Sequence, residues 1–156
     1  MKPTAQALQD IYLLKDLDAA TLALVAEAAT TQVVEAGEDL CREGQPSDGM
    51  YLIRSGSARV TKQRSDADVV ILGSGSHFGE IGLLDSGPRS ATVTAVERCE
   101  IVNLSTDALN AKLAAAPAAS AAFHRAVARS LARRLRATTD DLAFARQLSL
   151  DQRRHS

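Results

Sequence analysis

The order of apolar and polar positions divides the chain into three zones, and the first zone, residues 5–30, is predicted to be helical. Apolar side chains recur there at three-residue steps, at Leu8, Ile11, Leu14 and Leu17. Asp18 is placed to cap the alanine- and leucine-rich run that follows, because a carboxylate just before a helix accepts hydrogen bonds from its first free N–H groups. One-sided apolar spacing is typical of helices that pack on a core.

The second zone, residues 31–105, consists of short β-branched runs that are repeatedly interrupted by Gly, Pro, Ser and Asp. Runs of this length, separated by residues that form tight turns, predict an all-β sandwich or barrel. The candidate strands are Gln32–Glu35, Tyr51–Arg54, Ala58–Lys62, Val69–Leu72, Ser90–Ala95 and Glu100–Leu104.

The third zone, residues 106–150, returns to helical spacing. Thr106 and Asp107 can cap a short helix, and Pro117 suits the first turn of a longer one. In the longer helix, a seam close to a heptad repeat is formed by Phe123, Val127, Leu131, Leu135, Thr138, Leu142 and Ala145.

The length of this last helix bears on the oligomeric state. A helix of about 30 residues would be about 45 Å long at 1.5 Å per residue, and would extend past so small a barrel. We therefore expect part of the seam to pack against a second copy, which gives a homodimer through the C-terminal helix. The alternative is that the helix packs along its own barrel.

Composition fits an ordinary globular protein with a single domain, 1–156. The chain is 46% hydrophobic and 24% charged, and its net charge of −1 argues against binding nucleic acid through global electrostatics. The sequence has neither a run of about 18 apolar residues nor an apolar leader at its start. We therefore expect a cytoplasmic protein with no membrane partner.

Cysteines and histidines are sparse. Cys41 and Cys99 lie far apart and are expected to be reduced, partly buried thiols. His77, His124 and His155 show no spacing typical of metal ligands, so no metal is expected. His77 is expected to be a partly exposed loop residue.

The stretch HFGEIGLLDSGPRSATV, residues 77–93, places Glu80 and Arg89 among apolar residues, where unpaired charges are costly. Residues 78–84 are expected to form one helical turn beside glycine, whose exposed backbone N–H groups favour an anion. The planar fork of Arg89 suits phosphate oxygens, and the carboxylate of Glu80 suits a neutral hydroxyl such as a ribose 2′-OH. The two charges are thus spaced for a nucleotide, and the alternative is a structural ion pair between them.

The same stretch resembles the phosphate-binding cassette of cyclic nucleotide-binding domains. The resemblance rests on Phe78, Gly79, Glu80, Ile81, Gly82 and Leu83, then Pro88, Arg89, Ser90, Ala91, Thr92 and Val93, and upstream on Gly44, Tyr51, Ile53 and Gly56. It implies an eight-stranded jelly-roll barrel, 31–105, flanked by helices and holding the nucleotide inside, with the cassette at 78–93.

The resemblance also implies residue roles. Glu80 would accept from the ribose 2′-OH, and Arg89 would pair with the cyclic phosphate. Ser90 and the backbone N–H groups of Gly82 and Leu83 would add phosphate contacts. All the cassette residues named above except Thr92 are therefore candidate ligand-binding residues.

The last helix resembles the dimer helix of the bacterial catabolite activator family in LARRLRATTDDLAF, residues 131–144. In that family two consecutive hydroxyl residues reach the adenine, one from each subunit. The matching positions, Thr138 and Thr139, favour cAMP. Ser90 leaves cGMP open, since a hydroxyl there could bond the guanine amino group.

The activator family continues into a helix-turn-helix domain, whereas this chain ends at Ser156. We therefore expect no sequence-specific DNA binding. The leading hypothesis is a stand-alone cyclic nucleotide receptor, without catalysis or cofactor, that relays binding to an unknown downstream protein; a sensor domain from a longer chain is equally compatible. The rivals are a cupin-like enzyme, which needs a metal cluster, and an interaction scaffold with a vestigial pocket.

Overall fold

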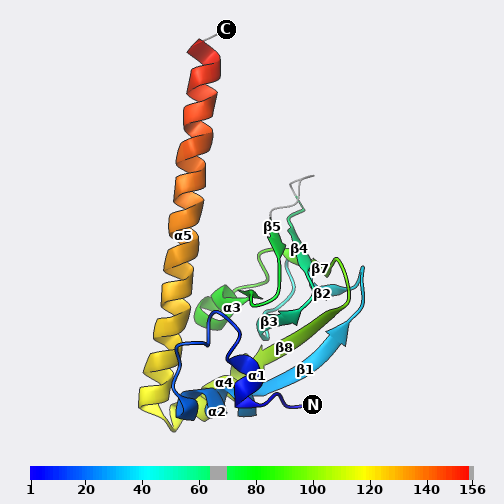
Figure 1. Cartoon of the computed structure of the whole chain (residues 1–156), viewed down its shortest axis with the longest axis vertical. Coiled ribbons are helices and arrows are strands. Elements are labelled where there is room, and N and C mark those ends of the chain that lie inside the picture. Colours follow the sequence, from blue (N-terminus) through cyan, green and yellow to red (C-terminus); the bar gives the residue numbers. More distant parts are fainter. Residues whose placement is uncertain (64–69, 155–156) are drawn as a thin grey trace.

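Two four-stranded antiparallel sheets face each other and form a barrel, with helices gathered at one end and along one side (Figure 1). The computed structural model describes residues 1–63 and 70–154. In the first sheet the strand order is β1-β8-β3-β6, and in the second it is β2-β7-β4-β5. The strands are β1 Ala29–Val34, β2 Asp39–Cys41, β3 Gly49–Ser55, β4 Ala58–Thr61, β5 Val70–Leu72, β6 His77–Phe78, β7 Thr92–Ala95 and β8 Cys99–Ser105.

Helices precede the barrel, interrupt it once and follow it. They are α1 Ala5–Leu8, α2 Ala19–Glu27, α3 Glu80–Asp85, α4 Thr106–Ala114 and α5 Pro117–Arg154. Figure 1 shows α1, α2 and α4 at one end of the barrel, while α5 runs along its side and extends well past it. The described residues thus confirm the predicted jelly-roll architecture of eight strands with flanking helices.

The predicted helical zone 5–30 is wrong as a continuous element. Between α1 and α2 the backbone forms successive three-residue turns, in which the N–H groups of Ile11, Leu14 and Leu17 donate to the carbonyl three residues earlier at 2.9–3.2 Å. Apolar spacing of three residues matches this tighter path better than the 3.6-residue period of an α-helix. Asp18 does cap α2, since its Oδ1 accepts from Thr21 N at 2.8 Å.

Each predicted strand overlaps an observed strand, but several of the predicted ends are wrong. The predicted strand residues that lie outside strands are Glu35, Lys62, Ser90 and Ala91, and Val69 lies outside the described residues. Arg89, just before β7, exchanges backbone hydrogen bonds with Gly44 and Gln45 instead of a neighbouring strand. The strands β2 and β6 were missed, because runs of three and two residues are too short to show alternation.

Helix starts in the third zone also differ in detail. The cap of α4 is Ser105, whose hydroxyl accepts from Ala108 N at 3.4 Å, and Thr106 and Asp107 are the first helical residues. Pro117 opens α5 as predicted.

Strand β3 separates two apolar clusters because its side chains alternate between its faces. Met50 and Leu52 belong to the cluster under α2, α4 and the start of α5, whereas Tyr51 and Ile53 belong to the cluster inside the barrel. This alternation aims Tyr51 toward the barrel interior.

The seam of α5 divides into two parts. Phe123 and Val127 are fully buried against the protein's own core, while Leu135 and Leu142 are 68% and 51% exposed. The start of the helix therefore packs on its own domain, and the remainder carries uncovered apolar side chains.

We expect Phe123→Ala to lower the free energy of unfolding by about 3–5 kcal/mol, because it leaves a cavity where α5 meets the core. Urea denaturation measures this change. Arg125→Ala, two residues along on the exposed side of the helix, is the control and should change stability by less than about 0.5 kcal/mol. Equal effects of the two replacements would contradict the packing described.

Candidate functional site

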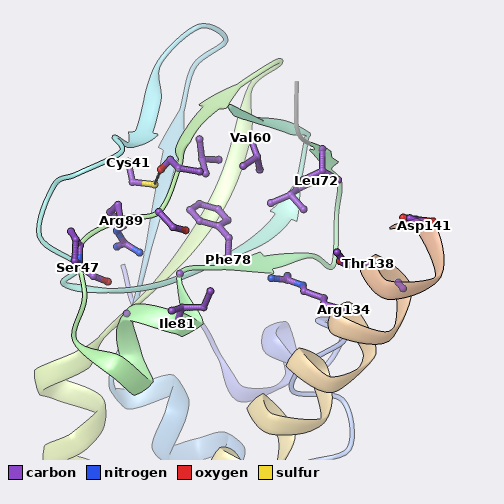
Figure 2. A pocket seen from close by; sticks show the side chains of 18 residues that line it. Cys41, Ser47, Val60, Leu72, Phe78, Ile81, Arg89, Arg134, Thr138 and Asp141 are labelled. Carbon is purple, nitrogen blue, oxygen red and sulfur yellow. Dashed lines mark hydrogen bonds between the residues drawn. The ribbon is translucent and has the colours of Figure 1, made fainter. Parts of the chain in front are cut away.

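A cavity of about 550 Å³ opens between the second sheet, the cassette and α5 (Figure 2). Its walls are the apolar side chains of β4, β5 and β7 on one side and residues 134–141 of α5 on the other. Of the predicted binding residues, those that line it are Phe78, Gly79, Ile81, Gly82, Pro88, Arg89, Ser90, Ala91, Val93 and Thr138. The structure thus gathers most of the predicted site around one cavity.

Arg89 is a buried cation in the wall of this cavity, with a residue exposure of 6%. Its Nη2 donates to Asp48 Oδ1 at 2.9 Å, and its guanidinium carbon lies 5.1 Å from the ring centroid of Tyr51. Its Nη1 is buried and has no hydrogen-bond partner among the described residues. A buried donor of this kind is costly unless an acceptor completes it, so the wall is suited to an anion.

Gly79 lets the guanidinium approach the cassette this closely. Its φ is +87°, a conformation that residues with a Cβ rarely adopt. A Cβ at this position would also collide with Nη1 of Arg89 and lie 3.0 Å from the carbonyl oxygen of Gly49. Both the backbone angle and the close approach therefore require glycine.

Glu80 does not pair with Arg89, so the alternative of an ion pair between them is wrong. Glu80 is 2% exposed; its Oε1 accepts from Arg134, and its Oε2 lies 3.3 Å from Nδ1 of His77. Burial favours the neutral acid, but the hydrogen bond with His77 and the charge of Arg134 outweigh it and lower the pKa of the Glu80 carboxyl. Each of the two cassette charges thus has its own partner.

His77 is a correction to the sequence analysis, since it lies in β6 and is only 4% exposed. Its Nε2 lies 2.6 Å from Oγ of Ser130 on α5. Its carbonyl oxygen accepts from Arg134, which also donates to Glu80. A buried polar network therefore joins β6, the cassette and α5.

Three predicted binding residues do not line the cavity: Glu80, Leu83 and Thr139. Leu83 packs against the helical core cluster. Thr139 is exposed, and its hydroxyl donates to the carbonyl of Leu135 at 2.8 Å. Thr138 and Thr139 consequently face different surroundings within this chain.

Sequence reasoning missed several site residues, chiefly Ser47, Asp48, Arg134 and Asp141. Arg134 and Asp141 carried a usable signal, because residues three or four positions from Thr138 share its side of a helix. Nothing in the sequence pointed to Ser47 and Asp48, because only the folding of the chain brings them next to the cassette. Cys41 also lines the cavity, and burial raises the pKa of its thiol.

Comparison with known proteins agrees with this geometry. The family model of the cyclic nucleotide-binding domain matches residues 31–116. The chain is 40% identical over 100 residues to a cAMP-dependent protein kinase regulatory subunit of Yarrowia lipolytica, covering 64% of this chain and 27% of that protein. It is 34% identical over 110 residues to the CRP-like cAMP-activated global transcriptional regulator of Mycobacterium tuberculosis, covering 69% of this chain and 47% of the regulator.

A solved structure resembles the whole fold. The N-terminal domain of a transcriptional regulator from Streptomyces coelicolor A3(2) superposes with a TM-score of 0.71 at 29% identity, covering 87% of this chain and 94% of that one.

The barrel, its cassette and a family match over more than half of the chain define a cyclic nucleotide-binding domain. This protein belongs to that family, as the cassette motif predicted. It spans only about a quarter and about half of the two curated relatives, respectively.

The described residues offer neither a metal-binding cluster nor a helix that could span a membrane. They contain no group of three or more His, Cys, Asp or Glu side chains that could hold a metal ion. Within the same ranges, no helix combines the length and apolar character needed to cross a bilayer.

We expect Glu80→Gln to destabilise the protein by about 1–3 kcal/mol at pH 7, because it leaves Arg134 and His77 without their carboxylate. The pKa of Glu80 is lowered on folding from its ordinary value of 4.5, so the unfolded chain binds more protons near that pH. The stability contributed by Glu80 is therefore present above about pH 4.5 and is lost as the pH falls further. Urea denaturation at pH 7 and pH 3 should show the gap between the two proteins closing in acid, and a constant gap would contradict the assignment.

Proposed function

We propose that this protein is a cyclic nucleotide receptor that binds cAMP in the cavity beside Arg89 and relays binding through α5. The observation that carries the proposal is the buried Nη1 of Arg89, a residue that lines the cavity, which has no partner among the described residues. A cyclic phosphodiester supplies the single negative charge that this donor requires. The names of the relatives, a cAMP-dependent regulatory subunit and a cAMP-activated regulator, support cAMP as the ligand.

The cavity has the chemistry of a nucleotide site along its length. We assign the phosphate to Arg89, with Ser90 and the backbone of Gly82 and Leu83 beside it. The apolar wall of Val60, Val70 and Leu72 offers a surface on which a base can stack. Thr138, on the opposite wall, is assigned to the base, and Thr139 is assigned to the site of a second copy.

Glu80 remains our candidate acceptor for the ribose 2′-OH, although it lies behind the cavity wall. Arg134 lines the cavity and donates to Glu80, so a ribose that reaches this carboxylate also meets α5. The ligand therefore acts on a group that already bonds the helix. A change in the helix follows only if the ligand binds one of its positions better than another.

We assign the site to binding alone, because the family to which it belongs is defined by cyclic nucleotide binding. The proposal is accordingly a regulatory module acting on a downstream partner. cGMP is the second candidate ligand, because Ser90 lines the cavity and can bond a guanine amino group.

We also propose that the uncovered part of α5 forms a homodimer. The apolar side chains Leu135, Leu142, Phe144 and Leu148 are each about half or more exposed in the single chain. Leu135 and Leu142 are seven residues apart, the spacing of one face of a coiled coil.

Arg89→Ala should weaken cAMP binding about 100-fold, because the phosphate loses its charge partner in a buried site. Isothermal titration with cAMP and with cGMP measures this loss and the order of the two ligands, with cAMP expected to bind more tightly. Arg42→Ala is the matched control, since Arg42 is a surface arginine paired with Asp39 outside the cavity. Unchanged cAMP affinity of the Arg89 variant would refute the assignment.

Leu135→Glu combined with Leu142→Glu should convert a dimer into a monomer, because the new carboxylates would face each other across the seam. Sedimentation velocity reports the mass. Gln147→Glu adds a charge to the same half of α5 on the opposite side of the heptad and should leave the dimer intact. A wild-type monomer at all accessible concentrations would overturn the proposed dimer.

A further inference from the structure

The loop that holds Arg89 contains a second buried donor beside the same cavity. Oγ of Ser47 is buried and has no hydrogen-bond partner among the residues that the structure describes. Ser47 lines the cavity together with Arg89, whose Nη1 is also buried and also lacks a hydrogen-bond partner among the described residues. Figure 2 shows Ser47 and Arg89 at the same end of the cavity, away from Thr138 and Asp141.

The residues on both sides of Ser47 in its loop contact the arginine. Its neighbour Asp48 accepts from Nη2 of Arg89 at 2.9 Å. Earlier in the same loop, Gln45 O accepts from Arg89 N at 2.8 Å, and Gly44 N donates to Arg89 O at 2.9 Å. The loop and the arginine are therefore held together at both main chain and side chain.

The two donors lie against two neighbouring glycines of the cassette. A Cβ on Gly79 would collide with Nη1 of Arg89, and a Cβ on Gly82 would collide with Oγ of Ser47. These glycines are three residues apart, so the donors approach neighbouring points of one short segment. An anion that reaches Nη1 of Arg89 along this segment comes close to the Ser47 hydroxyl.

We propose that Ser47 is a phosphate-binding residue, whose hydroxyl donates to the exocyclic phosphate oxygen that Arg89 does not hold. This inference rests on the proposed function. A cyclic phosphodiester has two exocyclic oxygens that share one negative charge, and each accepts hydrogen bonds. Arg89 contacts one, and Ser47, which lies against the same cassette segment, contacts the other.

Ser47 is better placed for this contact than Ser90, the hydroxyl that the motif suggests. Ser90 lines the cavity but is exposed, so water competes for its hydroxyl. The Ser47 hydroxyl is shielded, and a hydrogen bond from a shielded donor to a charged acceptor contributes more to affinity.

Ser47→Ala should weaken cAMP binding about tenfold in isothermal titration, the usual effect of losing a hydrogen bond to a charged group. Ser47→Gly, which also removes the hydroxyl, should give the same loss, and thermal melting checks that both variants fold. Ser55→Ala, an exposed serine at the end of β3, is the matched control and should bind as the wild type does. Wild-type affinity in either folded Ser47 variant would overturn the proposal.

The two phosphorothioate diastereomers of cAMP test the stereochemistry, because each carries sulfur in place of a different exocyclic oxygen. Sulfur accepts hydrogen bonds weakly, so removing the Ser47 hydroxyl should cost little for the diastereomer with sulfur facing it. The other diastereomer should still lose about tenfold. Equal losses for both would overturn the assignment of one oxygen to Ser47.

These outcomes distinguish a failure of the proposed function from a failure of the role assigned to Ser47. If wild-type protein binds neither cAMP nor cGMP, the proposed function fails and the role of Ser47 fails with it. If wild-type protein binds cAMP and depends on Arg89 but not on Ser47, only the role of Ser47 is refuted.

Discussion

The burial of one guanidinium is the constraint on which the site depends. Arg89 is withdrawn from water inside the barrel, and such a cation is tolerated only where its donors are satisfied. Asp48 occupies one end of the fork and Tyr51 covers its face, while Nη1 at the other end is buried beside Gly79 and has no hydrogen-bond partner among the described residues. Gly79 must lack a side chain for this placement. The fold of the described residues therefore leaves one buried donor of this charge unpaired, and the ligand that we propose would complete it.

A second set of buried polar groups connects the site to the rest of the molecule. The carboxylate of Glu80 has two hydrogen-bond partners, His77 of β6 and Arg134 of α5. The other ring nitrogen of His77 lies within hydrogen-bond distance of Ser130 on the same helix. Because each of these groups is costly to leave unpaired, the cassette and the helix are held in a mutual arrangement. Any ligand that alters the hydrogen bonds of Glu80 alters the contacts that fix α5.

The sequence was sufficient for the features that are local along the chain. The cassette could be identified because its glycines, glutamate and arginine are close in sequence, and the turn residues marked the β zone. Contacts between distant positions could not be predicted: Asp48 is 41 residues from Arg89, and Ser130 is 53 residues from His77. The turns before α2 were mistaken for helix because a three-residue apolar step is compatible with both conformations.

Because α5 is long, a small tilt near the barrel would move its far end by a larger distance. From Arg134, the last residue of the polar network along α5, the helix continues to Arg154, a distance of about 30 Å at 1.5 Å per residue. As a stiff rod pivoting near the barrel, it multiplies displacement: a tilt of about 5° would carry its far end about 3 Å. If ligand binding changes the contacts of Glu80 as we propose, the far end of α5 is where the resulting displacement would be largest.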